Sequence, residues 1–147
     1  MVSFPAWYFN EFNMAGVDFE DTAQVEAYDR NQTASTLDKE QDLVARLGIA
    51  AEHSVIDLGA GTGNFALQAS LTGASVHAVD ISKTMLTYAQ SKAQKAGVTN
   101  ISFHQAGFLS YEHQNNLADF VVTKNALHIL PDFWKLTSSP TLRYGDS

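Results

Sequence analysis

Cysteine is absent from the 147-residue chain, which excludes a disulfide frame, a thiolate zinc site and a cysteine nucleophile. Basic residues are scarce, with nine lysines and arginines against sixteen acids. The net charge of −7 argues against nucleic acid as a partner, because phosphate contacts need clustered basic side chains. No apolar run reaches the roughly 18 residues of a membrane span, and no basic leader precedes an apolar stretch at the N-terminus. We therefore expect a cytoplasmic protein that contacts no membrane.

The composition that remains is typical of one soluble globular domain, with 45% apolar and 17% charged residues. Residues 1–50 are predicted to form a helical N-terminal cap, and its first 20 residues carry many aromatic rings that would not be left in water. Residues 51–136 form the main half of the domain, and residues 137–147 form a polar tail. We expect these parts to make one compact domain overall.

Short apolar runs alternate with amphipathic segments from Ser54 onward. Near-continuous apolar strands separated by helices are typical of a parallel sheet covered on both faces. The sequence thus predicts an α/β fold with a three-layer, doubly wound, Rossmann-like arrangement and a mainly parallel sheet. The predicted strands are Val55–Leu58, Val76–Val79, Ile101–Phe103 and Phe120–Val122. The predicted helices are Asp21–Tyr28, one from Ser35 or Thr36 to Gly48, one beginning near Gly63, Ser82–Gly97, a turn or two between Ala106 and Leu117, and Asp132–Leu136.

The most informative motif is a glycine-rich turn directly after the first predicted strand. It reads Gly59-Ala60-Gly61-Thr62-Gly63, and Asp80 ends the next strand, 21 residues after Gly59. Glycines let the backbone approach a ligand where a Cβ would collide, and a carboxylate in this place can accept both ribose hydroxyls. The pattern predicts a site for a ligand that carries adenosine. A dinucleotide fingerprint is the nearest rival, but it requires its third glycine at the position of Asn64.

Asp57, two residues before this turn, has two interpretations of equal weight. It binds the ligand, or it ties the glycine turn through backbone N–H groups, and both roles are compatible. The histidines lack the spacing of metal ligands, so we expect no metal site. They are His53, His77, His104, His113 and His128.

The segment Val55–Pro131 resembles the class I S-adenosylmethionine-dependent methyltransferases, in its glycine turn, in Asp80 and in the stretch from the fourth predicted strand to Pro131. The resemblance implies that residues 51–136 bind S-adenosylmethionine. In that family the turn holds the methionine end of the cofactor, the acid after the second strand binds the ribose, and nearby apolar residues pack on the adenine. An acid-aromatic pair often follows the third strand; here the acid is replaced by Gly107 and the aromatic is Phe108. The implied cofactor-binding residues are Asp57, Gly59, Ala60, Gly61, Gly63, Asp80, Ile81, Met85, Gly107, Phe108 and Asn125.

The same resemblance implies an S-adenosylmethionine-dependent methyltransferase that acts on a small-molecule acceptor. No catalytic residue is assigned, and His128 is the candidate for a base. The family sheet has seven strands and this chain supplies the first four, in the order 3-2-1-4, as a C-terminally truncated member would. An inactive remnant that binds S-adenosylmethionine or S-adenosylhomocysteine is one alternative, and an interaction module is another. The fourth strand would lie at an exposed sheet edge, which predicts a homodimer through that edge.

Overall fold

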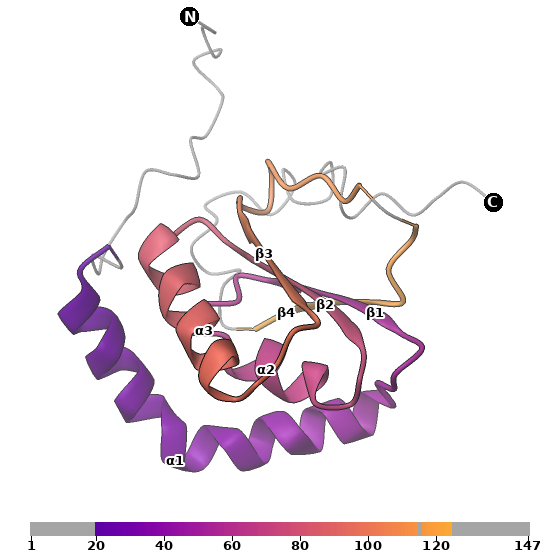
Figure 1. Ribbon diagram of the computed structural model, residues 1–147, viewed down its shortest axis with the longest axis horizontal. Helices are drawn as coiled ribbons and strands as arrows, with labels where there is room; N and C mark the ends of the chain where they lie inside the picture. The colour runs from indigo at the N-terminus through magenta and orange to yellow at the C-terminus, as the bar shows by residue number, and fades with distance from the viewer. Residues whose placement is uncertain (1–19, 115, 125–147) are drawn as a thin grey trace, which may run out of the picture.

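The computed structural model describes residues 20–114 and 116–124, without the side chains of residues 33–35. Within these residues a parallel sheet has the strand order β3-β2-β1-β4 (Figure 1). This arrangement confirms the predicted fold class and strand order. The strands are β1 (Ser54–Leu58), β2 (Ser75–Asp80), β3 (Ile101–Gln105) and β4 (Phe120–Thr123).

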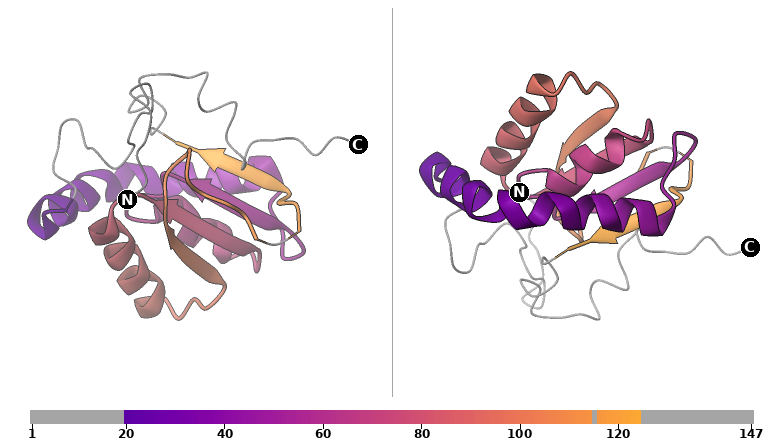
Figure 2. Two further views of the ribbon diagram at one scale, coloured as in Figure 1. Left: turned by 90° about the horizontal axis from the view of Figure 1, so that it is seen from above. Right: turned by 90° about the horizontal axis from the view of Figure 1, so that it is seen from below.

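The helices are α1 (Thr22–Leu47), α2 (Asn64–Ser70) and α3 (Lys83–Lys95), and they cover one face of the sheet. The crossovers from β1 to β2 and from β2 to β3 advance in the same direction, so right-handed connections place α2 and α3 on the same side. Figure 2 shows α1 running along that side, across α2. As predicted, α3 starts at an N-cap Ser82, whose hydroxyl accepts the backbone N–H of Met85 at 3.1 Å.

The N-terminal cap contains one helix of 26 residues where two short helices were predicted. The predicted outer boundaries are correct, because Asp21 caps the start and Gly48, at φ +70°, ends the helix in the left-handed conformation. Between them the sequence contains neither glycine nor proline, so nothing forces the backbone out of the helix. Figure 1 shows that α1 changes direction between its two halves, and these halves correspond to the two predicted helices.

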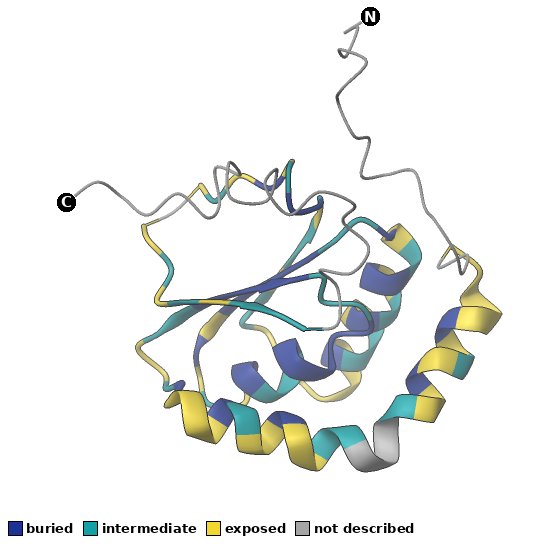
Figure 3. Ribbon diagram, turned by 180° about the vertical axis from the view of Figure 1, so that it is seen from behind, coloured by how far each residue is buried: buried dark blue, intermediate teal, exposed yellow. Residues whose placement is uncertain are grey.

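Each face of the sheet has its own apolar core. On the helical face Val55 and Val76 pack with Phe65 of α2 and Val44 of α1. The inward stripe of α1 is buried and its outward side is exposed (Figure 3). On the opposite face the buried cluster contains Ile56, Leu58, Val79, Phe108 and Tyr111.

The connection from β3 to β4 covers part of that opposite face. A helix of one or two turns was predicted here, but the described residues of this connection contain only a hydrogen-bonded turn over residues 108–110. The stretch is short and polar and must also carry the chain across β2 and β1, so it leaves little length for a helix.

Several sequence-based predictions lie outside the described residues. They concern the aromatic segment before residue 20, Asn125, His128, the helix from Asp132 and the polar tail. In the part of the chain that the structure describes, no helix combines the length and apolar character needed to cross a bilayer.

Candidate functional site

The glycine turn links β1 to α2 with three residues in the left-handed region. Gly59, Gly61 and Gly63 have φ of +75°, +56° and +79°. Residues other than glycine adopt these backbone angles only with strain. A Cβ added at Gly63 would lie 2.8 Å from the Cβ of Ala89 on α3, so this glycine permits close helix packing. A Cβ added at Gly61 would meet nothing within 4 Å. Gly61 therefore faces open space, as a ligand-binding turn requires.

Most backbone N–H groups of this turn donate hydrogen bonds to acceptors within the protein. Gly59 and Ala60 both donate to the carbonyl oxygen of Val79, at 2.8 and 2.9 Å, and Gly63 donates to Ala60 at 3.0 Å. Gly61 donates to the Oδ2 atom of Asp80 at 2.8 Å. The turn is thus held rigidly against the end of β2.

Asp80 has a structural role beyond the predicted contact with ribose. Its Oδ1 atom accepts the N–H of Ser82 at 2.9 Å while Oδ2 accepts that of Gly61. Burial raises the pKa of Asp80, and these N–H donors oppose the shift without cancelling it. Each carboxylate oxygen retains a second lone pair, so the side chain can still accept hydrogen bonds from a ligand.

Asp57 is only 2% exposed and has one carboxylate oxygen, Oδ2, without a hydrogen-bond partner among the described residues. Its carboxylate accepts the backbone N–H of Ala66 in the first turn of α2. Among the described hydrogen bonds, those from the glycine turn to a carboxylate go to Asp80, and both interpretations of Asp57 stay predictions. Burial raises the pKa of Asp57 to about 7; the negative charges of Glu40 and Asp80 add to the shift, and Lys124 opposes it.

A cavity of about 380 Å³ lies between α1, the glycine turn and the end of β4. Gly59, Gly61 and Asp57 line one side, and Tyr28 and Glu40 of α1 line the other. The cavity brings part of the predicted methionine-end site together and adds α1 as a wall.

Glu40 and Lys124 form an ion pair within this cavity, and Glu40 was not among the predicted site residues. The Glu40 side chain is buried, and its Oε2 atom has no partner among the described residues. A signal for it exists in the sequence, because Glu40 lies three residues after Leu37 and four before Val44, on the apolar stripe of the helix. An acidic residue on an apolar stripe indicates a buried carboxylate, which is costly unless it has a partner or a function.

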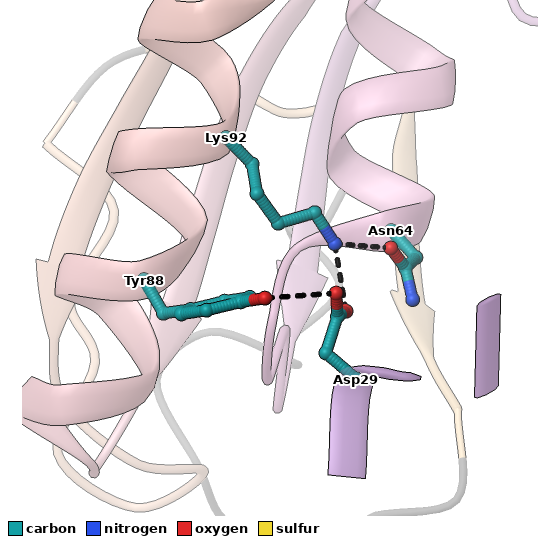
Figure 4. A network of polar contacts seen from close by, with 4 residues as sticks. All are labelled: Asp29, Asn64, Tyr88 and Lys92. Atoms are coloured by element: carbon teal, nitrogen blue, oxygen red, sulfur yellow. Dashed lines mark hydrogen bonds and ion pairs between the residues drawn. The ribbon is translucent and has the colours of Figure 1, made fainter. Parts of the chain in front are cut away.

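A second polar network joins the three helices (Figure 4). Asp29 of α1 accepts hydrogen bonds from Lys92 at 2.8 Å and from Tyr88 at 3.2 Å, both on α3. Lys92 also donates to Asn64 at the start of α2, and Thr62 of the glycine turn hydrogen-bonds Asp29. Burial disfavours the Asp29 anion, but the hydrogen bonds from Lys92 and Thr62 outweigh it and lower the pKa of Asp29. The network fixes α1 over the glycine turn.

The residues expected near the adenine lie at the ends of β2 and β3. Ile81 follows Asp80, and its carbonyl accepts a hydrogen bond from Gln105 at 3.2 Å. Met85 is buried on α3, and Gly107 donates to the hydroxyl of Ser110 at 2.9 Å. Phe108 belongs to the buried cluster on the face of the sheet opposite the helices. The structure therefore gives Phe108 a core role, and its predicted contact with adenine stays a prediction.

Three of the histidines that look scattered in the sequence meet on this same face. His77 and His104 approach to 3.1 Å between Nδ1 and Nε2, and His113 packs edge-on against His77 with ring centroids 4.8 Å apart. Burial is the main cause that lowers the pKa of His77 and of His104. Among the described residues no group of side chains has the arrangement of a metal site.

Comparison with known proteins agrees with this geometry. Residues 49–138, more than half of the chain, match the family model described as a methyltransferase domain. The uncharacterized methyltransferase YcgJ of Bacillus subtilis is 36% identical over 85 residues, which are 58% of this chain and 34% of YcgJ. Phosphoethanolamine N-methyltransferase 2 of Caenorhabditis elegans is 27% identical over 69% of this chain and 24% of its own length. The chain thus spans about a quarter to a third of the length of these relatives.

Solved structures show the same fold. The YcgJ crystal structure matches with a TM-score of 0.61 at 32% identity, over 67% of this chain and 43% of YcgJ. A SAM-dependent methyltransferase from Aquifex aeolicus matches with a TM-score of 0.69 at 21% identity, over 82% of this chain and 65% of that one. Together with the glycine turn and Asp80, these matches show that the chain belongs to the S-adenosylmethionine-dependent methyltransferases.

Proposed function

We propose that the chain binds S-adenosylmethionine along the C-terminal ends of β1 and β2, within a protein that methylates a small molecule. One observation carries the proposal: the glycine turn opens at Gly61 onto a cavity lined by Asp57, whose Oδ2 atom has no partner in the described part of the chain. The methionine end of the cofactor carries an ammonium group, which would give that buried oxygen a partner. Family membership supports the same assignment.

Different residues of the chain would bind different parts of the cofactor, according to their charge and shape. Asp57 and the glycine turn would hold the methionine end, Asp80 would accept ribose hydroxyls, and Ile81 with Met85 would provide apolar surface for the adenine. When bound, the cofactor supplies a methyl group already activated on a sulfonium. The chain therefore needs chiefly to position the two reactants and exclude water. The Asp29 network serves this end, because it holds α1 over the turn.

A small-molecule acceptor is part of the proposal and is supported by analogy. The Caenorhabditis elegans relative is named for phosphoethanolamine. One structural neighbour, from Haemonchus contortus, was solved with phosphomonomethylethanolamine and S-adenosylhomocysteine; its TM-score is 0.70 at 24% identity, over 84% of this chain and 32% of that one. Binding of S-adenosylhomocysteine without turnover of any tested acceptor would favour the inactive, cofactor-binding alternative.

Calorimetric titration of the chain with S-adenosylhomocysteine tests the cofactor assignment. We expect the Asp80→Asn variant to bind at least about tenfold more weakly than the wild type, a loss of about 1.4 kcal/mol. Asp119→Asn is the matched control, because Asp119 also accepts a backbone N–H, from Ser54 at 2.8 Å, but at the opposite end of the strands. Equal affinity for all three proteins, or no binding by a folded wild type, would refute the assignment.

We also propose that the chain forms a homodimer through β4. This strand is at the edge of the described sheet, and Val121 on it is 40% exposed. An edge with apolar residues pairs readily with another strand. Light scattering over a range of concentrations should give a dimer mass for the wild type and a monomer mass for Val121→Lys. A wild-type monomer at every concentration would contradict the proposal.

A further inference from the structure

A cluster of titratable rings joins the β3–β4 connection to the sheet on the face opposite the helices. His77 of β2 and His104 of β3 belong to the sheet, and Tyr111 and His113 belong to the connection. The ring centroids of Tyr111 and His104 are 5.3 Å apart, and those of His113 and His77 are 4.8 Å apart. His77 and Tyr111 are both buried. Residues 106–114 of the connection, drawn in orange in Figure 1, thus pack on the sheet through these rings.

The two sheet histidines share a single hydrogen-bond position. Nδ1 of His77 and Nε2 of His104 lie 3.1 Å apart, so one of these nitrogens donates its proton to the other. If both rings were fully protonated, two N–H groups would point at each other across this distance, and neither would have an acceptor. The contact therefore requires that at least one of the two rings is neutral.

The connection carries hydrogen bonds that continue from this pair toward the proposed cofactor site. Nε2 of His113 donates to the carbonyl of Asn116 at 3.1 Å, because a carbonyl only accepts, and Nδ1 contacts the hydroxyl of Tyr111 at 3.0 Å. The backbone N–H of Tyr111 donates to the carbonyl of Gly107 at 3.1 Å, and Phe108 packs in the same buried cluster as Tyr111. The connection therefore links the sheet histidines to Gly107 and Phe108, the residues expected near the adenine.

We propose that His77 and His104 form a pH-sensitive latch for residues 106–114. While the pair is neutral, these residues stay docked on the sheet. When both rings are protonated, their shared hydrogen bond is lost, two like charges lie under the buried Tyr111, and residues 106–114 are released. Release displaces Gly107 and Phe108, so acid weakens binding of the adenosine end of the ligand. The latch itself is independent of any ligand, whereas this effect on binding rests on the proposed cofactor.

The direction of the switch follows from the environment of the two rings. Burial, with smaller contributions from neighbouring histidines, lowers the pKa of His77 and of His104 below the ordinary value of 6.5. Above about pH 6.5 both rings are neutral in the docked and in the released state. As the pH falls below 6.5, the released state takes up protons that the docked state resists, so release becomes more favourable by up to about tenfold per pH unit for each ring.

The described groups around the pair supply no carboxylate whose charge would act on it. Among the described residues, the charges that act on either ring are those of His113 and of the pair itself. Burial raises the pKa of Tyr111, which keeps its hydroxyl neutral in this range. On β1 the residue opposite His77 is the apolar Ile56, and Glu112 of the connection is exposed. Protonation of the pair therefore adds charge that its surroundings do not neutralise.

Amide hydrogen exchange tests the latch, followed by NMR at pH 5.5 and 7.5 and corrected for the intrinsic exchange rate. The reporter is the N–H of Tyr111, and the control is the N–H of Leu86, which donates to the carbonyl of Ser82 at 3.1 Å at the start of α3. We expect the protection of Tyr111 to fall at least about tenfold from pH 7.5 to pH 5.5, while that of Leu86 does not fall. Equal protection of Tyr111 at both pH values would refute the latch.

A pair that does not titrate separates protonation from packing. In the double variant, H77N with H104Q, asparagine places an amide near the position of Nδ1 and glutamine places one near that of Nε2, so one hydrogen bond can persist at every pH. The protection of Tyr111 in this variant should not depend on pH. His53→Asn is the matched control, because Nδ1 of His53 accepts the N–H of Ala50 at 2.9 Å outside the cluster. A double variant with the wild-type pH response, or a His53→Asn variant without it, would overturn the proposal; the wild-type measurement decides it even if the double variant does not fold.

Calorimetry with 5′-methylthioadenosine, which lacks the amino-acid group, tests the effect on binding. The ratio of its affinities at pH 7.5 and pH 5.5 should be at least about threefold larger for the wild type than for the double variant, because Asp80 is the same in both proteins. If the folded wild type binds neither this ligand nor S-adenosylhomocysteine at pH 7.5, the proposed cofactor is wrong, and the exchange of Tyr111 still decides the latch. If the two ratios are equal while Tyr111 loses protection in the wild type, the link from the latch to the adenosine end is refuted.

Discussion

Replacing Asp57 by asparagine should stabilise the ligand-free protein at pH 8, although it removes a charged residue from the proposed site. Burial is the main reason that the pKa of Asp57 rises from 3.8 to about 7. Asparagine has nearly the same volume, and its carbonyl oxygen can still accept the N–H of Ala66. The substitution therefore removes the cost of ionisation and keeps the packing and the hydrogen bond.

The pH dependence follows from the direction of this shift. Below about pH 4 Asp57 is protonated in the folded and the unfolded chain, and it costs nothing. Between pH 4 and pH 7 the unfolded chain loses this proton and the folded chain keeps it, so the free energy of unfolding falls by up to about 1.4 kcal/mol per pH unit. Above pH 7 both states are ionised and the accumulated penalty stays constant. A shift of about three units corresponds to a total of roughly 4 kcal/mol.

Urea unfolding of the wild type and Asp57→Asn at pH 5, 6, 7 and 8 measures this penalty. The stability difference in favour of the asparagine variant should grow with pH and become constant above pH 7. Asp119→Asn removes one negative charge at an exposed position and controls for the change in net charge. A difference that does not depend on pH, or a wild type that is the more stable protein at pH 8, would refute the reasoning.

Three further predictions concern proton linkage, packing and the helix network. Binding of S-adenosylhomocysteine should release close to one proton at pH 6 and few at pH 8, since a ligand ammonium favours the ionised form of Asp57. Titrations in buffers of different ionisation enthalpy measure this proton release. Gly63→Ala should lower the free energy of unfolding, measured with urea, by about 2–5 kcal/mol, because strain at φ +79° adds to a 2.8 Å contact with Ala89. Gly48→Ala has similar strain but open space around the added Cβ, and should lower the free energy of unfolding by about 1–2 kcal/mol in the same assay. Asp29→Asn should cost about 1–3 kcal/mol at pH 7, and the loss should disappear as the pH falls below about 4, because the pKa of Asp29 is lowered in the folded protein; melting curves at both pH values test it.

The sheet could be predicted from the sequence because its signals are local. Each strand is a short apolar run, Ser82 and Gly48 mark helix ends by their own chemistry, and the glycine turn needs residues that tolerate positive φ. The continuity of α1, which was predicted as two helices, was missed for a related reason. A serine or threonine in mid-helix reads as a cap in the sequence, but a cap ends a helix only where the backbone leaves the helical conformation.

The contacts that define the site could not be predicted in the same way, because they join residues far apart in the chain. Glu40 and Lys124 are 84 residues apart, and nothing near either residue identifies the other as its partner. His77 and His104 meet only because the parallel register of β2 and β3 places them on one face. Side-chain pairing of this kind depends on tertiary geometry.

The distribution of hydrogen bonds around the glycine turn explains why those long-range contacts matter for function. A glycine-rich turn is usually expected to bind its ligand through exposed backbone N–H groups. Here four of those groups, including that of Gly61, already bond to the carbonyl of Val79, the carbonyl of Ala60 or the carboxylate of Asp80. These bonds hold the turn rigidly and leave fewer of its N–H groups for a ligand, so we expect side chains to contribute to the recognition of ligand charge. Among the described residues, the buried side-chain oxygens without a partner belong to Glu40 of α1, Asp57 of β1 and Thr123 of β4. Residues of α1 line the same cavity as the glycine turn, so α1 is a wall of that cavity as well as a cover over the sheet.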